Sequence, residues 1–251
     1  MQNGLVIATP DKHIPYHHKR ALPLMYEIID YAKPDLVIDL GDFADNKAFS
    51  RHRRKYGERF DPDADMDTVV EHAKLQDKAA RQKLKMLLGN HDLWFPNYIA
   101  ENAPAAERYV KTVGEVYELR DEPAPYQETF KVGKVGYVHD LGKYGVNAIR
   151  ETLMTAGHNV VFGHSHRGGT AYSGNDAGER HFGLNCGWLG DRNEIRYMNR
   201  SATKDWQLGF GAVRYVDGLA YASFVPMIEI DRRGRLPGKV HCYFGGKHFK
   251  G

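Results

Sequence analysis

The chain has 251 residues, and its content of 42% hydrophobic and 27% charged residues is ordinary for a soluble globular protein with a sizeable core. A net charge of only +3 excludes a polycation that binds nucleic acid through its overall charge. No apolar run approaches the roughly 20 residues needed to span a bilayer, and the run at residues 5–8 is too short for a secretion signal. The two cysteines, Cys186 and Cys242, give no disulfide framework, so we expect reduced, partly buried thiols in a cytoplasmic protein.

The first half of the chain alternates between buried strands and helices. Apolar runs predict three buried strands, at residues 4–9, 36–40 and 84–88. Two helices are expected between them, at residues 21–32 and 65–82. Pro23 falls in the first turn of the earlier helix, where its missing backbone donor costs little. This order predicts parallel strands joined by a right-handed crossover.

The second half of the chain predicts shorter elements. A hairpin turning at Gly133 is expected, followed by a helix over residues 146–156 and a strand over residues 160–162. Four more strands are expected, at residues 180–185, 208–215, 219–227 and 239–244. Asp217-Gly218 marks a hairpin between two of them, and we expect an antiparallel second sheet or sheet extension. No linker or repeat divides the chain, which predicts one domain spanning residues 1–251.

Polar side chains follow five of the predicted strands where each strand ends. They are Asp11 and His13, Asp42, Asn90 and His91, His139, and His164 and His166. Because ligands of open α/β sheets bind beyond the carboxyl ends of the strands, these side chains should converge on one place. Their oxygens and imidazoles suffice for two divalent ions with a shared carboxylate, and such mixed ligation suits Mn, Fe, Zn, Ni or Co. Two such ions clamp the attacking and departing oxygens of a phosphoryl displacement.

With these motifs the chain resembles the calcineurin-like metallophosphoesterases. The motifs that carry the resemblance are Asp11-x-His13, Gly41-Asp42, Gly89-Asn90-His91-Asp92, His139 and Gly163-His164-Ser165-His166. The tail is similar to a phage and prophage subgroup in two further stretches, Asn185-Cys186-Gly187-Trp188 and Trp206-Gln207-Leu208-Gly209-Phe210. Cys186 departs from the proline expected there. The resemblance implies an α/β fold, a two-sheet αββα sandwich.

The resemblance also implies the roles of individual residues. One metal ion would be held by Asp11, His13, Asp42 and His166. The other would be held by Asn90, His139, His164 and the bridging Asp42, with manganese as the first expectation for both ions. A metal-bound hydroxide would attack phosphorus, because a bound divalent ion lowers the pKa of water toward ~7. His91 would protonate the leaving alkoxide, oriented by Asp45. Asn46 stands where the protein phosphatase branch has arginine, which argues against a Ser/Thr protein phosphatase.

A basic cluster at residues 51–55 leaves two interpretations open. Arg51, Arg53 and Arg54 would hold the phosphates that flank the scissile one, or they belong to a solvated loop balanced by nearby acids. Five aromatic residues could stack a base, although packing under loops is the commoner role: Phe43, Tyr56, Trp94, Phe95 and Tyr144.

The remaining polar residues of interest are assigned structural roles. His17 and His18 are expected on the surface just before a helix, and the same expectation applies to His72, His158, His241 and His248. Asp92 is interpreted as the cap of the helix that follows it.

The expected function is metal-dependent hydrolysis of a phosphate ester. A phosphodiesterase acting on nucleic acid or a nucleotide is the first choice, supported by the basic loop, the missing arginine and the phage-like tail. A phosphomonoesterase for nucleotides or a phosphoprotein is the alternative. A non-catalytic metal-binding scaffold is a third possibility, but it would have no need of His91 and a complete ligand set. A phage-encoded protein would act in the host cytoplasm, and the oligomeric state stays open.

Overall fold

The computed structural model describes residues 1–51, 57, 59–174, 176–195, 203–230 and 238–251. Its centre is a five-stranded sheet with the strand order β10-β9-β1-β2-β3. These strands are β1 (Gly4–Thr9), β2 (Leu36–Asp39), β3 (Leu84–Met86), β9 (Gly209–Val216) and β10 (Leu219–Pro226). β1, β2 and β3 run parallel, as predicted, while β9 pairs antiparallel with β1.

A second five-stranded sheet has the order β4-β5-β6-β8-β7. Its strands are β4 (Phe130–Val132), β5 (Val135–Val138), β6 (Asn159–Phe162), β7 (Gly169–Gly174) and β8 (Arg180–Asn185). β5, β6 and β8 are parallel, so their carboxyl ends share one edge. This corrects the expectation that the late strands are all antiparallel: β8 is parallel to β6, and β9 and β10 extend the first sheet.

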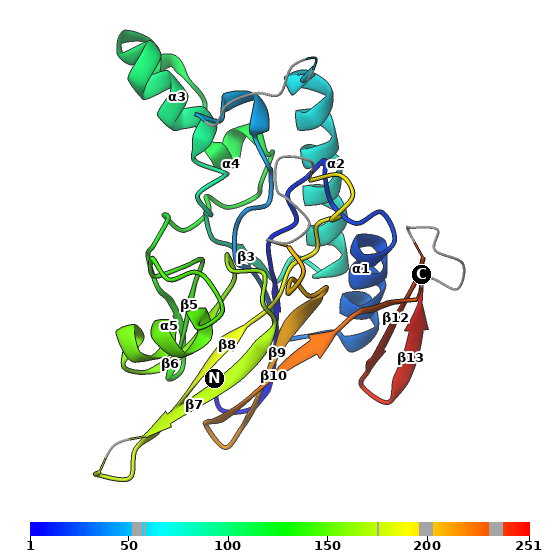
Figure 1. Ribbon diagram of the computed structural model, residues 1–251, viewed down its shortest axis with the longest axis vertical. Helices are drawn as coiled ribbons and strands as arrows, with labels where there is room; N and C mark the ends of the chain where they lie inside the picture. Colours follow the sequence, from blue (N-terminus) through cyan, green and yellow to red (C-terminus); the bar gives the residue numbers. More distant parts are fainter. Residues whose placement is uncertain (52–56, 58, 175, 196–202, 231–237) are drawn as a thin grey trace.

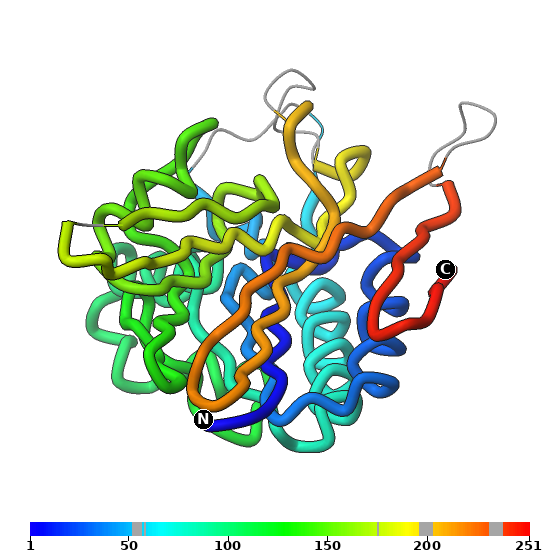
Figure 2. The backbone as a smooth tube through the Cα atoms, turned by 90° about the horizontal axis from the view of Figure 1, so that it is seen from below, coloured from blue at the N-terminus to red at the C-terminus, as the bar shows by residue number. Residues whose placement is uncertain are grey.

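Helices cover the outer face of each sheet. α1 (Ala21–Ala32) and α2 (Pro62–Ala79) pack on the first sheet, and α5 (Ala148–Ala156) packs on β6, β7 and β8 of the second. Figure 1 shows these layers, and Figure 2 shows the second sheet in green and yellow beside β1, β9 and β10, with α1 and α2 beyond them. The predicted αββα sandwich is therefore confirmed.

The alternation of side chains along β1 explains why the sandwich forms. Leu5 and Ile7 point into the core between the first sheet and its helices. Val6 and Ala8 point to the opposite face and pack between the two sheets. The continuous apolar run from Leu5 to Ala8 suits this place because both faces of the strand are buried.

The remaining elements lie outside the sandwich or above its edge. A small sheet is formed by β11 (Ile228–Ile230), β12 (Lys239–Phe244) and β13 (Lys247–Lys250), and its β13 contacts α1. The short elements are η1 (Lys47–Phe49), α3 (Trp94–Asn102), η2 (Pro104–Tyr109) and α4 (Val113–Val116). In the part of the chain that the structure describes, no helix is long and apolar enough to cross a membrane.

Several predicted bounds are confirmed, while two helices differ: α2 ends at Ala79 rather than at residue 82, and α5 begins at Ala148 rather than at residue 146. The helix at residues 21–32 and the strands at 4–9, 180–185 and 239–244 have the predicted bounds. α2 begins at Pro62 rather than at residue 65, because the Asp61 carboxylate accepts a hydrogen bond from the Ala64 backbone and proline suits the first helical position.

Candidate metal centre

The strand ends bring the predicted ligands together in two groups. One group is Asp11, His13 and His166, and the other is Asp42, His139 and His164. In each group the potential ligand atoms all lie within 4.8 Å of one another. Residues from both sheets meet in each group, since Asp11 and Asp42 follow β1 and β2 while His139 and His166 follow β5 and β6. A third group joins His13 to Asp45 and His91.

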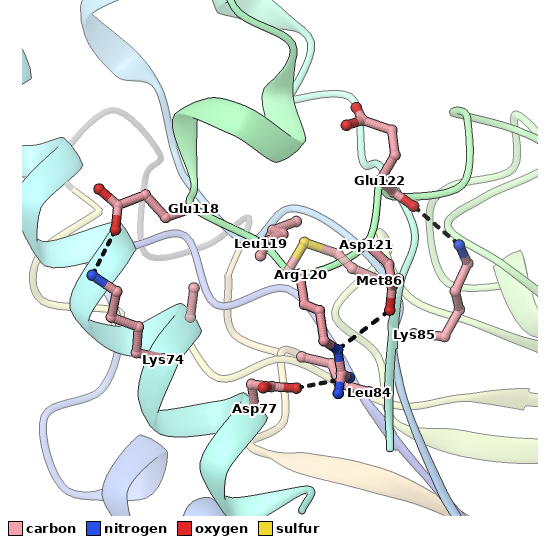
Figure 3. A pocket seen from close by; sticks show the side chains of 11 residues that line it. Lys74, Asp77, Leu84, Lys85, Met86, Glu118, Leu119, Arg120, Asp121 and Glu122 are labelled. Carbon is pink, nitrogen blue, oxygen red and sulfur yellow. Dashed lines mark hydrogen bonds and ion pairs between the residues drawn. The ribbon is translucent and has the colours of Figure 1, made fainter. Parts of the chain in front are cut away.

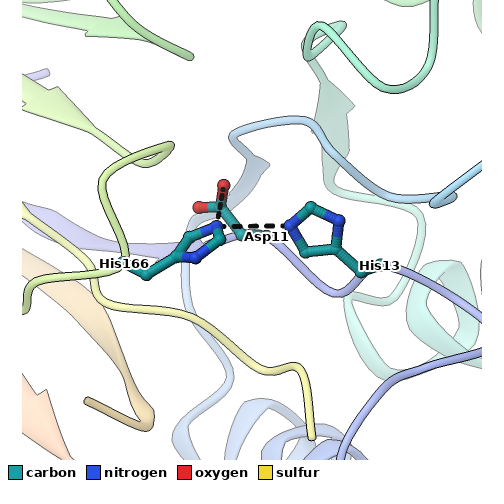
Figure 4. Close-up of side chains that lie close together, drawn as sticks. All are labelled: Asp11, His13 and His166. Carbon is teal, nitrogen blue, oxygen red and sulfur yellow. Dashed lines mark hydrogen bonds and ion pairs between the residues drawn. The ribbon is translucent and has the colours of Figure 1, made fainter. Parts of the chain in front are cut away.

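The first group consists of three buried side chains (Figure 4). The Nε2 atoms of His13 and His166 are 3.2 Å apart, and His166 Nε2 is 3.3 Å from Asp11 Oδ1. Two imidazole nitrogens and a carboxylate oxygen that face one another in this way are suited to surround a cation.

The second group centres on the His139 imidazole. Its Nε2 lies 3.2 Å from Asn90 Oδ1 and 3.4 Å from Asp42 Oδ2. Its Nδ1 is 2.9 Å from the Leu40 carbonyl oxygen, to which it donates when Nε2 is left free as a ligand. Asp42 Oδ2 also lies 3.8 Å from His13 Nε2, so this carboxylate stands between the two groups.

The backbone is strained where the ligands are presented. His13, Asp42, His164 and His166 all have φ values between 50° and 62°, a region that L-residues rarely occupy. Gly89 allows the chain to approach them, because a Cβ there would overlap the amide nitrogen and carboxylate of Asp42. The backbone N–H of His91 donates to Asp42 Oδ1 at 2.8 Å, which fixes that carboxylate.

The charges of the buried groups favour a bound cation. Burial lowers the pKa of His13, but the carboxylates of Asp45 and Asp42 outweigh it and raise the pKa to about 9. His139 is likewise buried, and Asp42 raises its pKa to about 10. His166 differs because burial dominates and lowers its pKa to about 4. The carboxylates thus hold protons on two imidazoles, and divalent ions would displace those protons on binding. The residues fit the expected metal ions.

His91 is held in place by Asp45 and Trp94. Its Nδ1 lies 3.0 Å from the Asp45 backbone carbonyl oxygen and 3.7 Å from the Asp45 carboxylate. That carboxylate is closer to His13, with Oδ2 3.2 Å from His13 Nδ1. Trp94 stacks on the His91 imidazole with ring centroids 3.8 Å apart. Burial, the largest effect, lowers the pKa of His91.

Asp92 is not a helix cap, which corrects the sequence interpretation. α3 begins after Leu93 without a side-chain cap. The buried Asp92 carboxylate instead accepts hydrogen bonds from the backbone N–H groups of Gly89 and Ala44 and from the Tyr117 hydroxyl, at 2.9, 3.1 and 2.9 Å. It therefore ties the turn that carries Asn90 and His91 to the segment that follows Asp42.

The structure adds supporting residues that the sequence did not single out for this role. Trp188 stacks on His166 with ring centroids 5.2 Å apart, and Trp206 meets its ring edge to face at 4.1 Å. The Asn185 side chain donates to the Gly163 carbonyl at 2.6 Å and to the Ser165 hydroxyl at 3.0 Å. Both tryptophans and Asn185 belong to the two tail stretches that resemble the phage subgroup, and this resemblance is the sequence feature that could have identified them.

A hollow of about 590 Å³ opens beside Asn90. Trp94, Tyr98, Tyr126 and Phe49 contribute to its lining, together with Arg51, which forms an ion pair with Glu101. Arg53, Arg54 and Tyr56 lie outside the described residues. The other three aromatic candidates do not line this hollow. Phe43 is fully buried and Phe95 packs on Phe49. Tyr144 is exposed, and the centroid of its ring is 5.8 Å from that of His164.

A different hollow lies between α2 and β3 (Figure 3). Ion pairs cross it from Lys74 to Glu118 and from Arg120 to Asp77. None of its described lining residues is a candidate ligand, so it is separate from the candidate metal centre.

His17 and His18 are not on the surface, contrary to expectation. They are 3% and 2% exposed because their segment pairs with residues 189–190, with a bridge from His17 to Gly190. The backbone N–H of His18 donates to the Leu189 carbonyl at 2.8 Å. His72, His158 and His241 are partly buried and His248 is exposed.

Comparison with known proteins identifies a family and related phage proteins. The family model for calcineurin-like phosphoesterases matches residues 6–216. The gene 54 protein of Mycobacterium phage L5 is 25% identical over 245 residues, covering 85% of this chain and 89% of that protein. The gene 54 protein of Mycobacterium phage D29 is 26% identical over 234 residues, covering 85% of this chain and 89% of that protein.

Solved structures with a similar arrangement include Vps29 from Entamoeba histolytica, studied as a single mutant, and the E. coli phosphoesterase Yfce. The first has 13% sequence identity and a TM-score of 0.46, covering 98% of this chain and 97% of that chain. The second has 13% identity and a TM-score of 0.44, covering 87% and 98%. The family model spans most of the chain and contains every strand end described above. The chain belongs to the calcineurin-like phosphoesterase family, metal-dependent hydrolases that act on phosphoester bonds.

Proposed function

We propose that this chain is a phosphodiesterase that uses two divalent metal ions to hydrolyse nucleic acid or nucleotides. The observation that carries the choice of substrate is the hollow of about 590 Å³ that begins at Asn90. It leaves room beside the scissile phosphate for a large organic substituent. A nucleotide or a nucleic-acid strand supplies such a substituent.

The two groups of side chains support a pair of ions that share Asp42. Asp11, His13, Asp42 and His166 would hold one ion. Asp42, Asn90, His139 and His164 would hold the other, with Asn90 contributing a neutral oxygen. Manganese is the first candidate, and Fe, Zn, Ni and Co suit the same ligands. When bound, such ions supply an activated water and neutralise the charge of the phosphate.

The chain's own residues would position the substrate and move a proton. His91 provides a proton for the leaving oxygen: its Nδ1–H donates to the Asp45 carbonyl and fixes the ring, and the imidazolium form carries the transferable proton on Nε2. Trp94 and Tyr126 offer aromatic surfaces for a base in the adjoining hollow. Arg51 on the same wall supplies a cation for a flanking phosphate, and Arg53 and Arg54 would extend this contact.

A comparison of two small substrates tests this function. Purified protein with Mn²⁺ is expected to hydrolyse a bis-aryl phosphate faster than a mono-aryl phosphate. Hydrolysis of the mono-ester alone would exclude the phosphodiesterase and leave the phosphomonoesterase. If metal is bound and neither ester is hydrolysed, the chain is a metal-binding scaffold.

Replacing His91 by asparagine is expected to lower turnover by about 10²- to 10⁴-fold, the usual contribution of a general acid. Metal content should stay nearly unchanged, because the proposed ligand sets do not include His91. Turnover of the bis-aryl phosphate and metal per chain by elemental analysis are the measurements. Loss of metal from the variant would show that His91 is a ligand and that the role proposed for it is wrong.

A further inference from the structure

A second hollow, of about 380 Å³, lies beside the candidate metal centre. It is lined by Trp206 and Trp188, the two tryptophans that contact His166. The hollow beside Asn90 has none of these lining residues. The candidate metal centre therefore has a large hollow next to each of its two groups of ligands.

A buried ring N–H belongs to the lining of this second hollow, and the Glu229 carboxylate beside it is too distant for a close hydrogen bond. His18 lines the hollow and is 2% exposed. Its Nδ1 accepts hydrogen bonds from the backbone N–H groups of Arg20 and Ala21 at 3.3 and 3.1 Å, so the ring proton is on Nε2. That Nε2 makes no hydrogen bond to any residue that the structure describes. The long contact with Glu229 leaves this buried donor poorly satisfied, and a ligand or water that accepts from it would stabilise it.

Acceptors stand beside this donor. The Glu229 carboxylate lines the hollow; its Oε1 accepts from the Gly238 backbone N–H at 2.6 Å and lies 3.5 Å from His18 Nε2, which leaves Oε2 for a ligand. Asp191 is a second carboxylate of the lining, and its Oδ1 is occupied by the backbone and side chain of Asn193. Arg192 is held at the lining by the Trp206 carbonyl, at 2.9 Å. Two carboxylates make the interior unsuitable for a phosphate and suitable for a group rich in N–H donors.

We propose that this hollow binds a guanine base of the substrate. Guanine carries two adjacent donors, N1–H and the 2-amino group, which one carboxylate accepts together, and its neighbouring O6 accepts from His18 Nε2. Uracil presents one N–H between two carbonyl oxygens, which would face the carboxylates unfavourably. Trp206 supplies an aromatic surface for the base, and Arg192 a cation for a phosphate at its edge.

The position of the base relative to the scissile phosphate rests on the proposed function, but its binding can be tested without hydrolysis. Guanosine, inosine and uridine carry no phosphate, so they do not depend on the metal ions for affinity. Calorimetric titration of the full-length protein, with and without Mn²⁺, is expected to show guanosine binding about tenfold more tightly than inosine, which lacks the 2-amino group. Uridine should bind more weakly still.

A substitution in the lining tests whether guanosine binds in this hollow. Glu229→Gln keeps the size of the side chain and an oxygen for the Gly238 N–H, and it should lower guanosine affinity about tenfold. The matched control is Glu194→Gln, an exposed carboxylate near the hollow that is not part of its lining, which should leave guanosine affinity unchanged. The thermal midpoint of each variant checks that it is folded.

The outcomes separate this inference from the proposed function. Equal affinity for guanosine, inosine and uridine, or guanosine binding that Glu229→Gln does not weaken, would overturn the guanine site. That result would leave the hydrolysis of a bis-aryl phosphate untouched. Guanosine-specific binding in a protein that hydrolyses neither aryl ester would support the guanine site and exclude the phosphodiesterase.

Discussion

Replacing Asp42 by asparagine is expected to lower the turnover of a phosphodiester by roughly a thousandfold or more, because metal ions supply several kcal/mol of transition-state stabilisation. Asp42 is the carboxylate that stands between the two groups, with Oδ2 3.4 Å from His139 Nε2 and 3.8 Å from His13 Nε2. Asparagine keeps an oxygen to accept the His91 N–H but removes the negative charge that two divalent ions would share. We expect the variant to hold less than the full complement of metal.

Elemental analysis of metal per chain and the rate on a bis-aryl phosphate check this prediction. Asp140→Asn is the matched control, since Asp140 is also buried and adjoins His139 but stands outside the three groups. Its Oδ1 accepts the Gly142 N–H, a role that the asparagine oxygen retains. An Asp42→Asn protein with full metal content and full activity would show that this carboxylate does not bridge two ions.

Replacing Lys12 by methionine is expected to reduce the free energy of unfolding by about 3–5 kcal/mol, the usual cost of removing one partner of a buried ion pair. Lys12 and Asp39 are both fully buried and form an ion pair beneath the loop that carries Asp11 and His13. Lys12 Nζ also donates to the Thr9 hydroxyl at 3.1 Å. Methionine would fill the space and leave the Asp39 charge uncompensated.

Denaturant unfolding followed by circular dichroism measures the loss, and a second substitution tests its cause. Lys12→Met with Asp39→Asn removes both charges, and it should recover most of the stability because Gln76 can still donate to the asparagine oxygen. Lys74→Met is the control, because it breaks an exposed ion pair with Glu118 (Figure 3) and should shift the midpoint little. If the double variant is as unstable as Lys12→Met, the buried charge is not the cause.

The sandwich and the family were predictable because the strands that build them have strong signals. β1 is buried on both faces, and its apolar run reads unambiguously. The strands that the sequence missed bury little. β13 has a single buried residue, Phe249, between lysines and a histidine, and β7 consists of small or exposed residues such as Tyr172, which is 73% exposed. Their pairing depends on neighbouring strands rather than on their own composition.

The candidate ligands were predictable as a set because each follows a strand and parallel strands end at the same edge. Roles that depend on distant partners were not predictable. Asp92 precedes a helix and resembles a cap, yet its partners include Ala44, 48 residues away in the chain. From the sequence alone His17 and His18 are expected on the surface, but the segment at residues 189–190, distant in the sequence, covers them in the fold.

Each of the two groups of candidate ligands draws residues from both sheets, so a bound ion would also affect how the chain unfolds. A divalent ion held by Asp11 and His166 would cross-link the edge of one sheet to the edge of the other. Such an ion binds only the docked sheets, so it stabilises docking by about 2.7 kcal/mol at a free concentration of about 100 times its Kd. The concentration of free metal would then affect how firmly the two sheets stay docked, as well as the rate of the reaction. At low metal concentration the two sheets would separate more readily.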